Sequence, residues 1–91
     1  MHKILYSIEA KNDLEEIRDY IAMDNDFYAN KVVEQIVWFI NWMISTFPLM
    51  WKENEKTWDR SITESTFWYK ILYTFDGKTV IIINVFKWKN M

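Results

Sequence analysis

Hydrophobic residues recur at helical spacing in two consecutive segments of the chain. The first stripe consists of Ala10, Leu14, Ile17 and Ile21, and the second consists of Ala29, Val33, Ile36, Ile40, Met43 and Phe47. The polar stretch 24–26 separates them, and Asn25 or Asp26 can cap the second helix. Pro48 ends that helix, because proline cannot continue the hydrogen-bond ladder. Two helices joined by so short a break are expected to lie antiparallel, as a hairpin.

Strand-like patterns lie on both sides of this hairpin. Residues 2–8 alternate polar and apolar positions, which predicts an N-terminal strand. The segment 48–56 is more polar and is expected to be a loop, and three strand-like runs follow it, at 57–63, 66–75 and 78–89. The predicted class is therefore α+β, with one domain over residues 1–91: an N-terminal strand, an antiparallel two-helix hairpin and a three-stranded antiparallel sheet.

Two turns predict how the last three strands pair. Asp76–Gly77 is a strong signal for a two-residue hairpin turn, and a second tight turn is expected at Glu64–Ser65. The resulting pairs are Tyr73 with Val80, Ile71 with Ile82, Tyr69 with Asn84, Phe67 with Phe86, Ile62 with Phe67, Arg60 with Tyr69 and Asp59 with Lys70, the last as an ion pair. This register places Arg60 on the more apolar face, together with Asn84, Phe86 and Trp88, and that face is expected to meet the helices. A one-residue error at the second turn would move Arg60 to the opposite face.

Composition excludes several classes of function. The chain of 91 residues is 51% hydrophobic and 19% aromatic, which excludes a disordered protein. It has no cysteine, which excludes disulfides, zinc–thiolate sites and a catalytic thiol. Since no metal-ligand pattern, phosphate-binding glycine loop or nucleophile elbow is present, no metal or cofactor is expected. No apolar run approaches the roughly 18 residues that span a membrane, and no signal peptide is recognisable, so we expect a cytoplasmic protein without membrane contact.

Charge is distributed unevenly along the chain. The net charge is −2, so the chain as a whole does not attract nucleic acid. Acidic residues crowd into the first third, whereas Lys70, Lys78, Lys87 and Lys89 dominate the last third. This asymmetry is typical of a solvated surface as well as of a binding surface.

The order and spacing of these residues resemble a known family. The segment Ala10-x-x-Asp13-Leu14-x-x-Ile17-x-x-Tyr20-Ile21 resembles the opening helix of ParE-type toxins from bacterial toxin–antitoxin modules. Ala29, Ile36 and Phe47-Pro48 follow where that family places an alanine, an isoleucine and a helix-ending proline. The runs Arg60-x-Ile62, Tyr69-Lys70-Ile71-x-Tyr73 and Ile81-Ile82-Ile83-Asn84-Val85 resemble its three C-terminal strands. The resemblance covers nearly the whole chain and implies the RelE/ParE-like β-α-α-β-β-β fold.

The resemblance also implies a function, with two branches. It implies the toxin of a type II (plasmid stabilization) module, neutralised by a cognate antitoxin. RelE-like members cleave messenger RNA on the ribosome, whereas ParE-like members poison DNA gyrase. RelE-like nucleases are strongly basic and carry arginines with a tyrosine or histidine near the last strand, but this chain is acidic and its only histidine is His2. These departures favour a ParE-like, non-enzymatic binder; a RelE-like endoribonuclease and an inactive partner-binding member stay open.

Arg60 and the C-terminal lysines are the candidate contacts to the target. Arg60, Lys87 and Lys89 could face phosphate groups or an acidic surface on the target, and a nuclease would use Arg60, Lys70, Lys87 and Lys89. Arg60 could instead be structural, stacking on Tyr69 or pairing with a helix carboxylate. Lys70, Lys87 and Lys89 share one predicted face and could form a basic strip, or could simply guard a strand edge from aggregation.

Trp38 and Trp42 are the candidate contacts to a partner protein. They lie four residues apart on the second helix, away from its apolar stripe. Exposed tryptophans are typical interface anchors, which indicates an antitoxin or a second copy of the chain, in a homodimer or a toxin–antitoxin hetero-oligomer. In the other interpretation, the loop 48–56 folds back and covers them.

Overall fold

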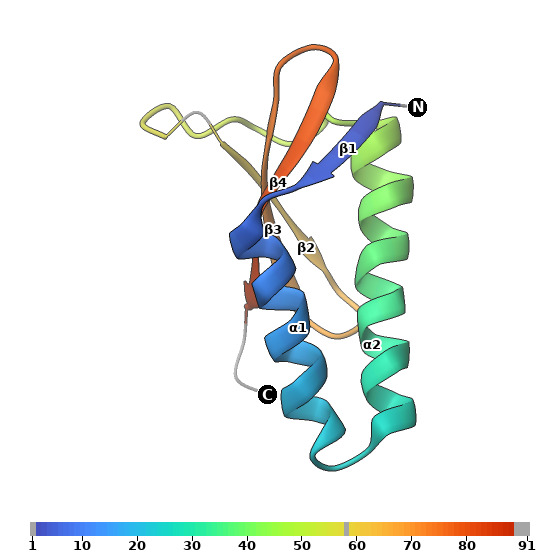
Figure 1. The fold of residues 1–91 in the computed structure, drawn as a ribbon. Coiled ribbons are helices and arrows are strands. Elements are labelled where there is room, and N and C mark those ends of the chain that lie inside the picture. The colour runs from blue at the N-terminus through green and yellow to red at the C-terminus, as the bar shows by residue number, and fades with distance from the viewer. Residues whose placement is uncertain (1, 58, 89–91) are drawn as a thin grey trace.

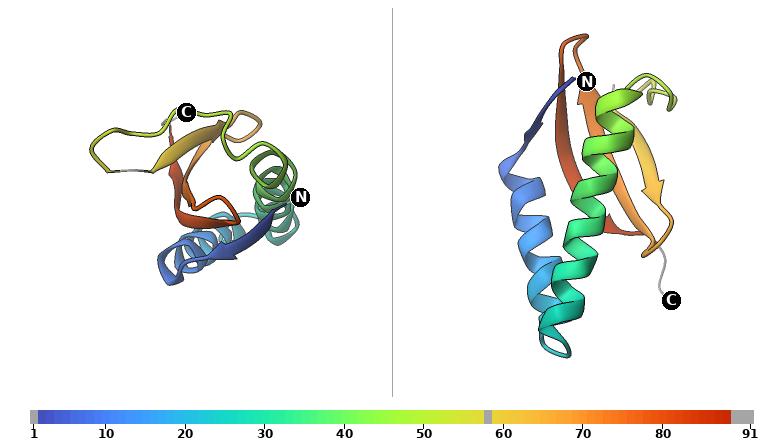
Figure 2. Two further views of the ribbon diagram at one scale, coloured as in Figure 1. Left: turned by 90° about the horizontal axis from the view of Figure 1, so that it is seen from above. Right: turned by 90° about the vertical axis from the view of Figure 1, so that its right-hand side faces the viewer.

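The fold was analysed in a computed structural model, which describes residues 2–57 and 59–88 (Figure 1). Its elements follow the predicted order. They are β1 (Lys3–Tyr6), α1 (Ile8–Ala22), α2 (Asp26–Phe39), a π-helical turn η1 (Ile40–Ile44), β2 (Arg60–Glu64), β3 (Tyr69–Phe75) and β4 (Thr79–Lys87). Both helices lie on the same side of the sheet, which gives two layers (Figure 2). None of the helices in the described ranges is long and apolar enough to cross a membrane.

The sheet has four strands in the order β1-β4-β3-β2. Strands β2, β3 and β4 pair antiparallel, as predicted. The N-terminal strand joins the same sheet and pairs parallel with β4, from Lys3 opposite Thr79 to Tyr6 opposite Ile82. The sheet is therefore mixed instead of purely antiparallel, and β4, the last strand in the sequence, lies in its interior.

Short polar side chains set the starts of both helices. Ser7 caps α1, since its Oγ accepts from the backbone N–H of Ala10 at 3.0 Å, and the same hydroxyl donates to the carbonyl of Ile83 at 2.8 Å. Asn25 caps α2 by accepting from the N–H of Tyr28 at 3.0 Å. One cap thus also ties the start of α1 to β4.

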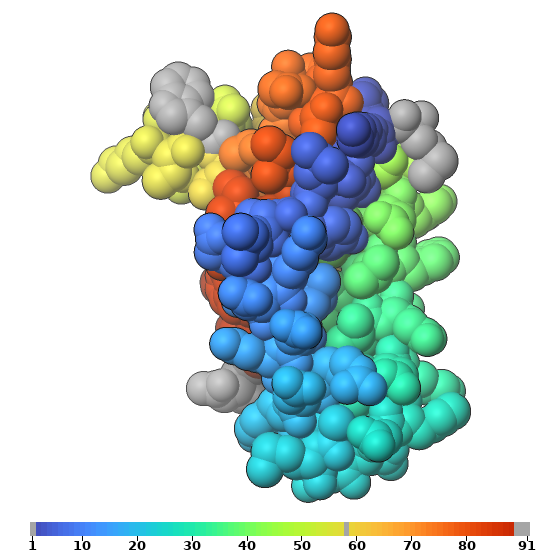
Figure 3. Space-filling view, in the orientation of Figure 1, coloured from blue at the N-terminus to red at the C-terminus, as the bar shows by residue number. Residues whose placement is uncertain are grey.

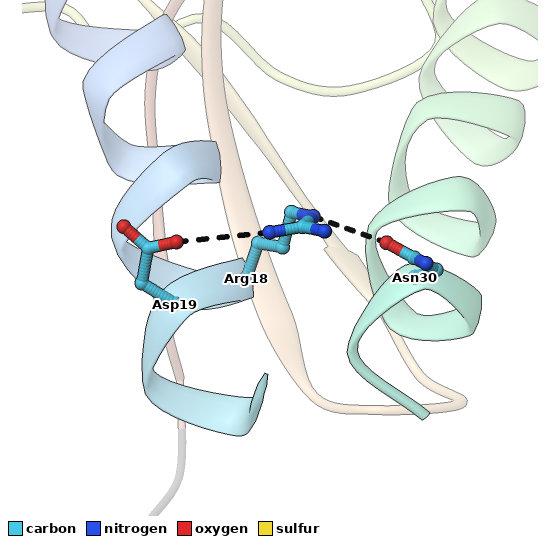
Figure 4. Close-up of polar contacts among 3 residues, drawn as sticks. All are labelled: Arg18, Asp19 and Asn30. Atoms are coloured by element: carbon cyan, nitrogen blue, oxygen red, sulfur yellow. Dashed lines mark hydrogen bonds and ion pairs between the residues drawn. The ribbon is translucent and has the colours of Figure 1, made fainter. Parts of the chain in front are cut away.

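The two arms of the helical hairpin are joined by a polar contact on their surface (Figure 4). Arg18 Nε donates to Asn30 Oδ1 at 3.0 Å, and Arg18 also lies 3.8 Å from the carboxylate of Asp19. These groups are exposed, so the contact adds little to stability. The antiparallel hairpin expected from the short connection is confirmed.

The hydrophobic core lies between the two helices and one face of the sheet. Its fully buried residues include Ala10, Val32, Ile36, Ile40, Ile44, Ile71, Tyr73, Val80 and Ile82. The predicted stripe of the second helix is correct at Ala29, Ile36 and Ile40, but Val33 is half-buried and its neighbour Val32 is buried in its place. Beyond Ile40, Ile44 is buried whereas Met43 is half-buried and Phe47 is exposed. The π-helical turn at this point is wider than an α-turn and rotates the following residues out of the predicted phase.

The turn between β3 and β4 is shifted by one residue from the prediction. Asp76 and Thr79 close it, since the N–H of Asp76 donates to the carbonyl of Thr79 at 3.3 Å. Gly77, at φ +96°, and Lys78 therefore form the two-residue loop. The Asp76 carboxylate accepts from the N–H groups of Thr79 and Lys78, at 2.7 and 2.9 Å, which lowers its pKa. The register moves by two residues, so that Phe75 pairs with Val80.

A β-bulge in β4 changes which residues face the helices. Leu72 pairs with Asn84 and Tyr73 pairs with Ile82, so Ile83 has no counterpart on β3. Beyond this residue the alternation is reversed. Val85 is buried, whereas Phe86 is exposed, which contradicts the predicted helix-facing positions of Asn84 and Phe86.

The turn between β2 and β3 is four residues long, not two. Glu64 pairs with Tyr69, and residues 65–68 form the turn, with Trp68 at φ +63°. Arg60 therefore lies opposite Tyr73 instead of Tyr69. Because the register moves by an even number of residues, Arg60 stays on its predicted face. The predicted ion pair between Asp59 and Lys70 is wrong, since Lys70 lies opposite Thr63.

Candidate binding surfaces

Arg60 is held by the segment that joins α2 to β2, which stands out from the body of the molecule (yellow in Figures 1 and 3). Its Nη1 donates to the backbone carbonyl of Trp51 at 2.6 Å, and its backbone forms a bridge with Glu53. Opposite Arg60, the hydroxyl of Tyr73 donates to the carbonyl of Pro48 at 2.8 Å. Both side chains thus fix this segment to the sheet. This is a structural role for Arg60, but not through the predicted stacking on Tyr69 or pairing with a helix carboxylate, since Arg60 lies opposite Tyr73 and donates to the carbonyl of Trp51.

The buried tyrosines of β3 are poor acids in this environment. Burial raises the pKa of Tyr73 to about 12, although the neighbouring Arg60 opposes the shift. The pKa of Tyr69 is also raised, first by burial and then by the nearby phenols of Tyr28 and Tyr20. At neutral pH these hydroxyls therefore act as hydrogen-bond donors or acceptors, not as ionised groups.

Lys70 and Lys87 do not form the predicted basic strip. Lys87 lies opposite Tyr69, whereas Lys70 lies opposite Phe86, and the β-bulge places the two lysines on different faces of the sheet. Lys87 Nζ donates to the carbonyl of Phe67 at 2.7 Å and lies 4.8 Å from the ring centre of Tyr69. Lys70 Nζ lies 3.9 Å from the ring centre of Trp88. Lys89, the third member of the predicted strip, lies outside the described residues.

Trp38 and Trp42 form a stacked pair on the outside of the helical layer. Their ring centres are 5.7 Å apart and their planes differ by 13°. The side chains are 57% and 52% exposed, so the interpretation that the loop 48–56 covers them is wrong. Trp51 of that loop packs against the core instead. The pair is therefore open to a partner.

A groove of about 780 Å³ runs between α1, the first half of α2, the end of β4 and the turn 65–68. It is lined by Asp13, Glu16, Ile17, Tyr20, Ile21, Tyr28, Val32, Phe67, Tyr69, Val85, Phe86 and Lys87. The sequence interpretation did not identify Glu16, Tyr20 and Tyr28 as members of one site. The only available signal was local: Glu16 and Tyr20 are four residues apart and so share a helix face.

Two charged groups of the groove are engaged within the fold. Asp13 Oδ2 accepts from the backbone N–H of Val85 at 2.8 Å and from Asn84 Nδ2 at 3.1 Å. It therefore ties α1 to β4 directly beyond the β-bulge. Lys87 donates to the carbonyl of Phe67, as described above. The carboxylate of Glu16, in contrast, is exposed and forms no ion pair within the described part of the chain.

A smaller hollow of about 410 Å³ lies beside Trp38. It is lined by Lys31, Glu34, Gln35, Trp38, Thr66 and Phe67. Phe67 borders both spaces, and its ring meets that of Tyr28 edge to face at 5.8 Å. Across residues 2–57 and 59–88, no group of three or more histidine or carboxylate side chains could hold a metal ion.

A match to a protein-family model shows to which family the chain belongs. The family model described as the ParE toxin of the type II toxin–antitoxin system, parDE, matches residues 4–89. The chain belongs to the ParE toxin family. The resemblance seen in the sequence is thereby confirmed.

Solved structures support the ParE fold. The chromosomal ParDE toxin–antitoxin system of P. aeruginosa has a chain that is 20% identical, with a TM-score of 0.82, and the match covers 98% of each chain. A chain of the RelBE2 toxin–antitoxin complex of Mycobacterium tuberculosis is also 20% identical, with a TM-score of 0.73, over 94% of this chain and 96% of that one. No curated protein sequence matches. Both comparisons show that the chain has the β-α-α-β-β-β fold expected from the resemblance.

Proposed function

We propose that this ParE-family toxin acts in the cytoplasm by binding a macromolecular target, with DNA gyrase as the first candidate, and that a cognate antitoxin neutralises it. The family match over residues 4–89 carries this proposal. The solved ParDE and RelBE2 systems each contain an antitoxin, which supports the same kind of partner here.

The spacing of the cations favours binding over RNA cleavage. Cleavage requires cations that converge on one phosphate and usually a group that transfers a proton. Arg60 lies opposite Tyr73, whereas Lys87 lies opposite Tyr69, which is four residues earlier in β3. At about 3.3 Å per residue, their backbone positions are roughly 13 Å apart along the sheet. Lys70 lies on the other face, so these three cations do not surround one phosphate.

Arg60 and Lys87 remain our candidate contacts to the target. Each uses one N–H group for a carbonyl of its own chain, and the guanidinium and ammonium groups have further donors. Lys89 is proposed with them on sequence grounds. A target surface with separated acidic groups would suit this spacing better than a single phosphate.

The antitoxin is proposed to cover Trp38 and Trp42. Two stacked, solvent-exposed tryptophans offer a large apolar area at little cost in conformational entropy on binding. A homodimer through the same pair is the competing outcome. Sedimentation of the purified chain, alone and with the protein encoded by the adjacent reading frame, separates the two. A dimer that dissociates on Trp38→Ala would contradict the antitoxin assignment.

The function is tested by inducing the chain without its antitoxin and by adding the purified protein to a DNA supercoiling reaction with gyrase. We expect growth arrest with a DNA-damage response, intact messenger RNA and inhibited supercoiling. Rapid arrest of translation with cut messenger RNA would instead establish the RelE-like nuclease, for which Arg60, Lys70, Lys87 and Lys89 are the candidate residues. Normal growth would identify an inactive member that only binds its partner.

A further inference from the structure

The mouth of the groove along α1 combines an unpaired carboxylate with exposed aromatic rings. Glu16 and Tyr20 lie one turn apart on α1, and Tyr28 lies across the groove at the start of α2. Tyr20 is 78% exposed and Tyr28 is 47% exposed, so both rings can be reached from solvent. Tyr28 is held at one edge by Phe67, which limits its freedom to move.

The charge of the groove is negative where it is open. Its lining contains the carboxylates of Asp13 and Glu16 and the ammonium group of Lys87, which gives −2 + 1 = −1. Asp13 and Lys87 are engaged by backbone groups of the chain itself. Hydrogen bonds to neutral backbone groups leave these charges in place, so the lining keeps a net charge of −1, and Glu16 is its exposed carboxylate.

The three phenols of the groove lie close to one another. Tyr20, Tyr28 and Tyr69 all line the groove, and the phenols of Tyr28 and Tyr20 add to the effect of burial in raising the pKa of Tyr69. The faces of aromatic rings carry negative electrostatic potential and attract cations, most strongly when a planar guanidinium can stack on them. Apolar side chains of Ile17 and Ile21 line the same wall and suit the aliphatic stem of a long basic side chain.

We propose that this groove binds an arginine side chain supplied by the neutralising segment of the antitoxin. The guanidinium group pairs with Glu16 and stacks on Tyr20 or Tyr28, while its stem lies along Ile17 and Ile21. This proposal rests on the proposed function for the existence of the antitoxin, and it adds the chemistry of the contact. Phe67 borders both the groove and the hollow beside Trp38, so that one segment could occupy both.

The proposal is tested by NMR titration of the full chain with N-acetyl-arginine amide, and with the citrulline analogue, which has the same shape without the charge. We expect the arginine compound to shift the ring resonances of Tyr20 and Tyr28 with a millimolar Kd, and the citrulline compound to shift them far less. Glu16→Gln should weaken arginine binding about fivefold. Glu15→Gln is the matched control, because Glu15 is equally exposed but does not line the groove.

Equal shifts from both compounds, or arginine binding unchanged by Glu16→Gln, would overturn the proposal. A short single-stranded RNA that shifts the same rings, and whose binding is lost in Lys87→Gln, would assign the groove to nucleic acid and would also overturn it. The supercoiling reaction with the unaltered protein reports separately on the proposed function. A protein that binds arginine but leaves gyrase unaffected contradicts the target assignment only, and one that inhibits gyrase without binding arginine contradicts the groove assignment only.

Discussion

The two ends of strand β3 use their polar side chains in opposite ways. At the end near Phe75, Tyr73 and its neighbour Arg60 donate to carbonyl groups of the segment 48–51, at 2.8 and 2.6 Å. At the other end, near Tyr69, the groove presents Glu16 and the phenol of Tyr20 to solvent. Arg60 supports the fold through one N–H group and keeps further donors for a target, whereas Glu16 forms no ion pair within the described residues and is exposed for recognition. Within one small sheet, the end of β3 near Phe75 therefore contributes mainly to stability and the end near Tyr69 mainly to binding.

Glu64 should show the largest effect on stability, because it is 1% exposed and links α2 to the turn 65–68. Its carboxylate accepts from Gln35 Nε2 at 3.0 Å and from the N–H of Phe67 at 2.8 Å. Glu64→Ala leaves both donors without this partner and should lower the free energy of unfolding by about 3 kcal/mol, measured by urea denaturation. Glu55→Ala, at an exposed position, should change it by less than about 0.5 kcal/mol. Equal effects of the two substitutions would show that the buried carboxylate does not organise the turn.

Arg60→Ala should lower the free energy of unfolding by about 2 kcal/mol, because the hydrogen bond from its charged group to Trp51 is lost. Arg60→Lys keeps a cation but not the planar fork, so it should lose about half as much. Urea denaturation and the growth assay are applied to the same variants. If Arg60→Ala abolished toxicity without a change in stability, Arg60 would belong with the recognition surface and the comparison would fail at this residue.

Tyr73→Phe removes the hydroxyl that donates to Pro48 and should cost about 1 kcal/mol. The pH dependence gives an independent measurement. Since the pKa of Tyr73 is raised from 10.0 to about 12 in the folded state, its contribution is fully present below pH 10 and is lost as the pH rises to about 12. Unfolding followed between pH 9 and 12 should therefore show a steeper loss of stability for the parent than for Tyr73→Phe. Parallel curves would indicate that the phenol ionises as readily in the folded chain as in the unfolded one.

Trp38→Ala and Trp42→Ala should have the smallest effect, with a change of less than about 1 kcal/mol, because both rings are more than half exposed. Trp51→Ala serves as the contrast and should cost about 2 kcal/mol, because that ring is partly buried against the core. Binding of the adjacent gene product, followed by calorimetry, should weaken in the first two variants. A large loss of stability in Trp38→Ala would mean that the pair supports the fold instead of a partner.

Features encoded by local chemistry were predictable from the sequence. The two helices follow from their apolar spacing, the cap at Asn25 from its side-chain oxygen, and the end of the helical layer from Pro48. Gly77 marked the hairpin of β3 and β4 because it can adopt a positive φ, although the loop itself begins one residue later than expected. Each of these signals acts within a few residues of the structure that it specifies.

Features that depend on distant partners were not predictable. No residue near Ile83 predicts the β-bulge. Its contacts come from the N-terminal region: Ser7 donates to the carbonyl of Ile83, and Asp13 accepts from the N–H of Val85. The four-residue turn before β3 depends on Glu64, and one of the hydrogen-bond donors to its carboxylate comes from α2. Arg60 was placed on the correct face because the error in register happened to be even. The groove was missed because its walls come from α1, α2, β3, β4 and the turn 65–68, which only the folded chain brings together.

The pairing of β1 with β4 also has a consequence for the timing of synthesis. Lys3–Tyr6 are translated more than seventy residues before their partners Thr79–Ile82. The helical hairpin can form early from local contacts, whereas the sheet cannot be completed until β4 has emerged. The sheet is therefore completed only after the helical hairpin has left the ribosome.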